Sequence, residues 1–184
     1  MMLLVEIPFS GRVWALPFLT VLATSEKVDR AQGRHHKTSI DWIGQMVAVV
    51  RRWLPTRALV LVVDGGLAAV KLGLRCAADS VGIIYVSRLR LDAALYDNPL
   101  PQPKGKRGKK PKKGSRQASL KSRLSDPTTV WQTQVVAWYG GRTRLLEIAT
   151  GTARWYTSGH DPLPIRWVLV RDPLGRLVPS AFFA

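Results

Sequence analysis

The spacing of hydrophobic and polar residues along the chain predicts a mixed α/β fold. Two apolar stretches, residues 3–8 and 13–23, flank a short polar turn, which is the pattern of a β-hairpin. Over residues 39–54, apolar side chains recur at steps of three and four, which predicts an amphipathic helix packing one face on a sheet. Thr38 or Ser39 is suited to cap this helix. A hairpin and a helix are therefore predicted ahead of the most apolar part of the chain.

An unbroken apolar run over residues 58–63 precedes Asp64 and two glycines. A short run rich in β-branched residues is typical of a strand buried on both faces. A helix at about residues 67–78 and a strand at 81–86 follow, so this region has the pattern of a βαβ unit with parallel strands. Asp64 lies at the carboxyl end of a strand, where open α/β sheets gather functional groups. From the local sequence alone, its carboxylate could bind a metal, act as a base or cap the next helix.

The character of the chain changes after residue 91. Residues 98–117 are rich in Pro, Gly and Lys and show no apolar periodicity, so we expect a mobile basic arm there. Seven of the ten residues from 104 to 113 are basic. Beyond the arm, alternating polar and apolar residues predict four or five antiparallel strands, with a turn at residues 171–176. The chain is thus predicted to be a βαβ region and an all-β region joined by a basic segment.

The composition favours a polyanionic partner. The chain has 28 Lys and Arg against 12 Asp and Glu, a net charge of +16, which favours nucleic acid first and an anionic membrane surface second. Its 46% hydrophobic residues can build a core, while no stretch approaches the ~18 apolar residues of a membrane-spanning helix. The first residues lack the basic region of a signal peptide. The single cysteine, Cys76, excludes a disulfide framework, and we expect it to be buried in a protein of the reducing cytosol.

A series of short motifs runs along the chain in this order: "SGRVWALPFLTVLA", "GRHHKTSIDW", "RRWLP", "LVLVVDGGLAAV", "YVSRLRLDAALYD", a basic Pro/Lys arm, "WYGG", "EIATGTARWY" and "PIRWVLVRDPLGR". This order resembles bacterial insertion-sequence transposases with a DDE, RNase H-like catalytic domain, over essentially all 184 residues. Such proteins cut and join transposon ends in DNA, using three carboxylates that hold two divalent metals. The resemblance implies a partial RNase H-like core over residues 1–90, a basic Pro/Lys-rich linker or arm over 91–118 and an antiparallel β-rich insertion over 119–184.

Only the second carboxylate of the family pattern has a counterpart here, and it is Asp64 in "VVDGG". The resemblance implies that Asp64 is a catalytic metal ligand for Mg²⁺ or Mn²⁺, hard ions that prefer oxygen ligands. The elements bearing the first and third carboxylates would lie outside residues 1–184, and Glu6 and Glu147 stand in the wrong motifs to replace them. We therefore expect an internal piece of a transposase, from a truncated or frameshifted element, that is inactive in cleavage and strand transfer by itself. The alternative is a non-catalytic basic DNA-binding protein.

The other candidate residues concern contact with DNA. Arg88 and Arg90, in "SRLRLD", either meet DNA near Asp64 or are surface charges, and Asp92 is expected to pair with one of them. The adjacent His35 and His36 point apart in an extended segment and have no third ligand, so a position near DNA or a capping role is expected instead of a metal site. The arm is expected to contact phosphates without sequence preference through Lys104, Lys106, Arg107, Lys109, Lys110, Lys112 and Lys113.

Four of the seven tryptophans, Trp131, Trp138, Trp155 and Trp167, lie in the predicted β region. We expect them to pack in the core and against the sheet, and stacking on DNA bases is the alternative. No P-loop and no nucleophile elbow is found in the sequence. The resemblance implies a cytoplasmic bacterial protein associated with the nucleoid, with no membrane partner and with a homo-oligomer as an open alternative for the intact family.

Overall fold

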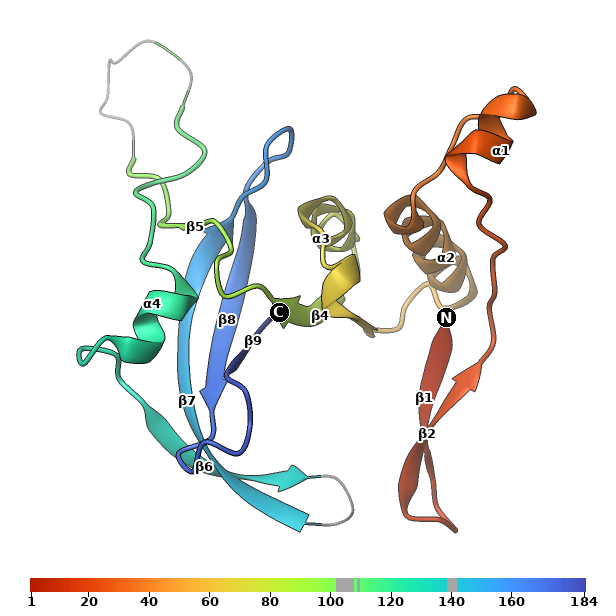
Figure 1. Ribbon diagram of the computed structural model, residues 1–184. Helices are drawn as coiled ribbons and strands as arrows, with labels where there is room; N and C mark the ends of the chain where they lie inside the picture. The colour runs from red at the N-terminus through yellow and green to blue at the C-terminus, as the bar shows by residue number, and fades with distance from the viewer. Residues whose placement is uncertain (102–107, 109, 139–141) are drawn as a thin grey trace. The chain divides into compact units, whose positions relative to one another are not determined.

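The computed structural model describes residues 1–101, 108, 110–138 and 142–184 of the chain (Figure 1). It divides into two compact units, residues 1–57 and residues 58–184. The predicted boundaries at residues 90 and 118 rest on composition and on the family resemblance, and they stay a prediction. Each compact unit is described below by itself.

The first unit begins with the predicted hairpin. Strands β1 (Met2–Ile7) and β2 (Arg12–Pro17) pair antiparallel, and Gly11 closes the turn with a φ of 58°. The second strand was expected to continue to residue 23, and this expectation is wrong. Pro17 already pairs with Met2, so the residues that follow it have no partner on β1.

Two helices complete the first unit, α1 (Glu26–Ala31) and α2 (Ser39–Trp53). Helix α2 confirms the predicted amphipathic helix, while its packing on a sheet stays a prediction. Thr38 caps it in a capping box, in which its hydroxyl accepts from the Asp41 backbone and the Asp41 carboxylate accepts from the Thr38 backbone. Helix α1 was not predicted, because it is short and polar, and its start depends on one cap in which Ser25 accepts from the Val28 N–H.

The second unit contains a seven-stranded mixed sheet. Its order is β3-β4-β9-β8-β7-β5, with β6 also pairing to β7. The pair β3–β4 is parallel and all other pairs are antiparallel. This mixed sheet with a few helices confirms the α/β class and is consistent with a partial RNase H-like domain. The strands are β3 (Leu59–Val63), β4 (Ile83–Leu89), β5 (Leu95–Tyr96), β6 (Gln132–Trp138), β7 (Arg142–Trp155), β8 (Leu163–Arg171) and β9 (Ser180–Phe183).

Helical segments connect and cover parts of this sheet. The helix expected at residues 67–78 is divided into a 3-10 turn, η1 (Gly65–Leu67), and α3 (Val70–Ala77), which together form the crossover from β3 to β4. The sequence analysis missed a short helix, α4 (Leu120–Ser125), because the pattern of the surrounding region predicts strands. The Ser119 hydroxyl caps this helix by accepting a hydrogen bond from the Ser122 N–H. Strand β4 lies slightly later than the predicted 81–86, because Gly82 adopts a φ of 91° and delays its start.

The core of the second unit lies where α3 packs on the sheet. Leu72 of α3, Leu169 of β8 and Phe183 of β9 are almost completely buried. The Tyr85 ring packs edge-on against Phe183, with ring centroids 5.1 Å apart. Cys76 is buried on the same helix, as expected, and burial raises the pKa of its thiol to about 11. The buried face of α3 therefore holds the β3–β4 crossover on the sheet.

Candidate functional site

Asp64 follows β3 directly, at the carboxyl end of the parallel strand pair, as the sequence predicts. Its side chain is exposed, and its Oδ1 accepts a hydrogen bond from the Gly66 N–H at 2.8 Å, so that Asp64 caps η1. The capping role that the local sequence allows is thus present. Within the described part of the chain, the other carboxylate oxygen accepts no hydrogen bond.

The parallel register places Asp64 beside the end of β4. Val63 pairs with Ser87, whose hydroxyl donates to the Val63 carbonyl at 2.9 Å, so Arg88 is the neighbour of Asp64 on the next strand. Gly65 allows this close approach, because a Cβ at residue 65 would lie 3.0 Å from the Arg88 Cβ. The tight glycine exit after β3 therefore fits the chain against β4.

Asp64, Arg88 and Arg90 line one open cavity of about 360 Å³, together with the start of β9. Arg88 Nη2 donates to the Ser180 hydroxyl at 3.1 Å. This bond links the end of β4 to β9, the neighbouring strand. The structure thus brings together the predicted carboxylate and the two predicted arginines.

Arg90 is partly neutralised by its own neighbour. Its Nε and Nη2 donate to the two carboxylate oxygens of Asp92 at 2.9 and 2.7 Å. This bidentate contact confirms the expected pairing, and it lowers the pKa of Asp92 because the guanidinium stabilises the ionised carboxylate. Arg88 is therefore the cation of this cavity that has no carboxylate partner within the described residues.

The acidic residues of the described chain do not by themselves fit a two-metal site. No group of three or more His, Cys, Asp or Glu side chains lies close enough to hold a metal ion in the described ranges. Asp64 supplies one carboxylate, whereas a pair of divalent ions about 4 Å apart needs several bridging oxygen ligands. The cationic Arg88 beside it suits a phosphate better than a second cation.

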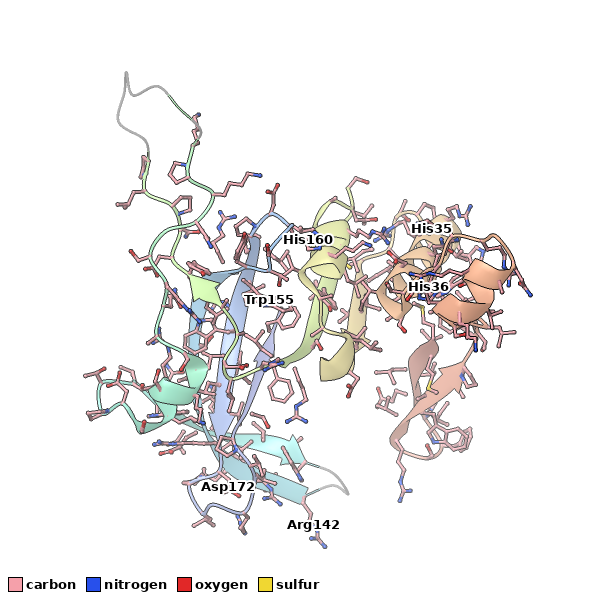
Figure 2. All side chains as sticks on the ribbon, turned by 45° about the horizontal axis from the view of Figure 1, so that its top comes forward. His35, His36, Arg142, Trp155, His160 and Asp172 are labelled. Atoms are coloured by element: carbon pink, nitrogen blue, oxygen red, sulfur yellow. The ribbon has the colours of Figure 1, made fainter. Side chains whose placement is uncertain are left out.

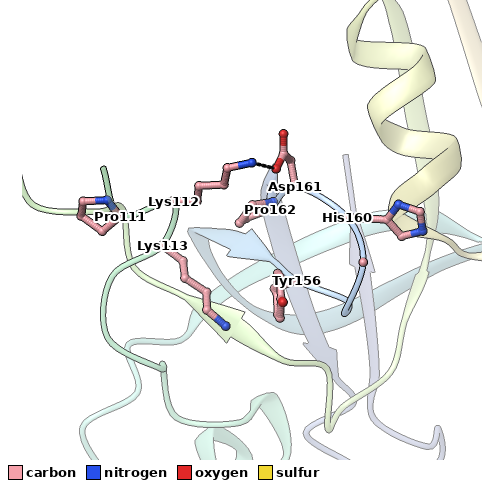
Figure 3. A pocket seen from close by; sticks show the side chains of 8 residues that line it. Pro111, Lys112, Lys113, Tyr156, His160, Asp161 and Pro162 are labelled. Carbon is pink, nitrogen blue, oxygen red and sulfur yellow. Dashed lines mark hydrogen bonds and ion pairs between the residues drawn. The ribbon is translucent and has the colours of Figure 1, made fainter. Parts of the chain in front are cut away.

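The basic arm is only partly described. Lys104, Lys106, Arg107 and Lys109 lie outside the described residues. Of the remaining predicted residues, Lys110 is exposed, Lys112 forms an ion pair with Asp161, and the Lys113 Nζ lies 3.6 Å from the centre of the Tyr156 ring (Figure 3).

The described end of this arm is held on the sheet. Gly114 N donates to the Asp97 carbonyl at 2.9 Å, and Asp97 N donates to the Ser115 carbonyl at 2.8 Å. Lys112 and Lys113 also line a cavity of about 700 Å³ with Tyr156 and the loop that joins β7 to β8 (Figure 3). The expectation of a mobile arm is therefore wrong for residues 112–115, where contacts with the protein itself use both lysine side chains.

The predicted histidines lie in the connection between α1 and α2 (Figure 2). His36 Nδ1 lies 2.9 Å from the Asp29 Oδ2, while His35 is exposed. Sequence reasoning missed Asp29, which is buried although it is charged. Hydrogen bonds from Thr24 and His36 lower the pKa of Asp29 by stabilising its ionised form.

The four tryptophans of the β region have different surroundings. Trp167 is buried, and Trp155 packs against Phe183 with ring centroids 5.1 Å apart, which confirms core packing for these two. Trp131 and Trp138 are half-buried and carry arginines on their rings, Arg171 at 4.0 Å and Arg144 at 5.1 Å respectively.

A mixed sheet that presents a carboxylate at the tip of a parallel strand is consistent with a partial RNase H-like domain. The sequence model of the family described as DDE superfamily endonuclease matches residues 3–149, and the chain belongs to this family. The family supports a nuclease function of the transposase or endonuclease kind. No curated protein and no solved structure matches the chain. None of the described helices is long and apolar enough to cross a membrane.

Proposed function

We propose that this chain belongs to the DNA-handling core of an insertion-sequence transposase that cleaves phosphodiesters and transfers strands. The observation that carries the proposal is the placement of Asp64 and Arg88 in one open cavity at the carboxyl end of parallel strands, in a chain of the DDE superfamily endonuclease family. The substrate is DNA at transposon ends and targets. As a DNA-bound protein of bacterial origin it would lie on the nucleoid, and copies of the protein would associate there.

In this proposal Asp64 is the metal ligand that the chain contributes. Its other carboxylate oxygen, which accepts no hydrogen bond from the described residues, is a hard donor suited to Mg²⁺ or Mn²⁺. Arg88 would hold a DNA phosphate beside it, and Arg90 and the arm lysines would add phosphate contacts along the backbone. Because the described residues bring no second carboxylate to Asp64, we also propose that this polypeptide does not nick DNA or transfer strands by itself.

A supercoiled plasmid and a labelled DNA duplex test this function together. The chain should bind the duplex with an affinity that falls steeply with salt, because phosphate contacts release counterions. The plasmid should stay intact in Mg²⁺ and in Mn²⁺. Cleavage that needs metal and disappears in Asp64→Asn would overturn the proposed inactivity, and failure to bind DNA at low salt would overturn the DNA role itself.

Binding without catalysis is the second candidate, favoured by the net charge of +16. The first candidate places DNA in the Asp64 cavity, whereas the second binds DNA through basic residues spread over the surface. If the cavity belongs to the DNA path, Arg88→Gln should weaken duplex binding several-fold and make the salt dependence shallower by about one counterion. Arg12→Gln, an equal loss of charge in the exposed hairpin, is the control. Equal effects of the two variants would favour a diffuse basic DNA-binding protein.

A further inference from the structure

The turn that joins α1 to α2 is fixed by local hydrogen bonds. Gly33 adopts a φ of 63°, its N–H donates to the Arg30 carbonyl at 3.1 Å, and the Arg34 N–H donates to the Asp29 carbonyl at 2.8 Å. This is a Schellman ending, in which glycine takes the left-handed conformation that other residues avoid. It brings the residues of "GRHHK" back over Asp29.

Asp29 is the centre of a buried polar cluster in this turn. It is only 5% exposed, its Oδ1 accepts from the Thr24 hydroxyl at 2.6 Å, and Arg34 Nε lies 3.6 Å from the same oxygen. Its Oδ2 lies 2.9 Å from His36 Nδ1. An ionised carboxylate can only accept, so Nδ1 carries the hydrogen, and Nε2 is the ring nitrogen left for another partner. The His36 side chain keeps 29% of its surface exposed.

The exposed charges of the turn are positive. Arg34 is 55% exposed, and Lys37 Nζ lies 4.7 Å from the centre of the Trp42 ring. The acidic residues nearby are buried or already bound to other groups. Asp29 is buried, Glu26 binds Arg30 at 2.6 Å, and Asp41 belongs to the capping box of α2. Phosphate groups of DNA are commonly bound by Lys and Arg side chains, and no acidic residue lies between Arg34 and Lys37 in this turn.

We propose that Arg34 and His36 form a second contact for the DNA backbone, in which His36 Nε2 donates to a phosphate oxygen and Arg34 binds the same phosphate group. Asp29 is a positioning residue that holds the imidazole in one orientation and one tautomer. The inference rests on the proposed DNA function, but it concerns the unit of residues 1–57 and not the Asp64 cavity. A purely structural clamp between α1 and the turn is the competing explanation.

The proposed contact needs a hydrogen on Nε2 of the His36 ring. The charged and titratable groups of this turn are Asp29 on α1, then Arg34, His35 and Lys37, and finally Asp41 at the start of α2. Imidazolium donates a charged hydrogen bond to phosphate, while neutral imidazole with its hydrogen on Nδ1 offers only a lone pair at Nε2. The contact therefore uses the imidazolium form, with Asp29 on Nδ1 and the phosphate on Nε2.

His36→Asn separates the two explanations, because an Asn amide can still donate to Asp29 but has no group at the position of Nε2. Fluorescence anisotropy of a labelled duplex would be measured with the full chain at several salt concentrations. For His36→Asn we expect about tenfold weaker binding, a salt slope shallower by about one, and the same loss on unrelated sequences. His35→Asn is the matched control, and it should bind like the wild type.

Two further results decide the inference. Arg34→Gln leaves the backbone of the turn intact and should also weaken binding with a shallower salt slope. If His36→Asn and Arg34→Gln both bind like the wild type, the turn is only a structural clamp and the proposal is overturned. If the wild type binds no DNA, the proposed function fails first. If Arg88→Gln alone weakens binding, this inference fails while the proposed function stands.

Discussion

Gly151 lies in the middle of β7, directly opposite Trp167 of β8. A Cβ at residue 151 would lie 2.6 Å from Cζ2 and 2.9 Å from Cε2 of the indole ring. Trp167 is only 4% exposed, so this rigid ring cannot swing away as the end of a flexible side chain would. Replacing glycine by alanine in a strand normally stabilises by roughly 0.5–1 kcal/mol, whereas overpacking a core costs roughly 1–3 kcal/mol. We expect Gly151→Ala to lower the free energy of unfolding by about 1–2 kcal/mol.

Urea unfolding followed by far-UV circular dichroism measures this change through the transition midpoint at constant slope. Trp167→Phe provides the second arm of a double-mutant cycle, because phenylalanine lacks the outer indole ring that the new methyl group would meet. The indole Nε1 is buried without a hydrogen-bond partner among the described residues, so its removal leaves no acceptor unsatisfied. In the Trp167→Phe background, Gly151→Ala should be neutral or stabilising. If Gly151→Ala with Trp167 in place is as stable as the wild type, the overpacking argument is refuted.

Three other predictions follow from single contacts. Cys76, whose thiol pKa is raised by burial to about 11, should resist Ellman's reagent at pH 8 until the protein is unfolded in urea. The pKa of Asp29 is lowered in the fold, so its ionised carboxylate stabilises the protein above the unfolded pKa of about 4. This stabilisation is lost as pH falls through the lower folded pKa. Between pH 6 and pH 3, the melting temperature should therefore fall less in Asp29→Asn than in the wild type. Gly114→Ala should speed tryptic cleavage at Lys113 while leaving the sheet signal unchanged, because its Cβ would lie 2.5 Å from the Asn98 backbone oxygen; an unchanged cleavage rate would contradict this.

Local signals in the sequence were sufficient for several elements. The apolar period and the Thr38 cap located α2, and the apolar run before Asp64 located β3 and its exposed end. The expected burial of this strand on both faces is wrong, because Val60 and Val62 are exposed on a strand at the edge of the sheet. The placement of Arg88 beside Asp64 also followed, because two parallel strands joined by one crossover end at the same edge. These features depend on neighbours close in sequence, where spacing and capping chemistry decide the structure.

Other features depend on partners that no local pattern identifies. The pairing of β4 with β9 joins distant segments, and only the three-dimensional structure reveals it. The bond between Asp29 and His36 requires the turn at Gly33, and a short helix without an apolar stripe gave no reason to expect that turn. The end of the basic arm had the composition of a free linker, yet backbone bonds to Asp97 hold it on the sheet.

The β4–β9 pairing also has a consequence for how the protein is made. Ser87 pairs with Phe183, so the ribosome must deliver residues 180–183 before β4 gains its neighbour on that side. Until then, a nascent chain carries β3 and β4 as a parallel pair with an open edge, which is a template for wrong pairing. Pairing residues 87–89 with residues 181–183 is slow, because the chain loses conformational entropy before the contact forms and compensates for that loss. The strand that bears Arg88 therefore stays without this neighbour until residues 180–183 have been synthesised.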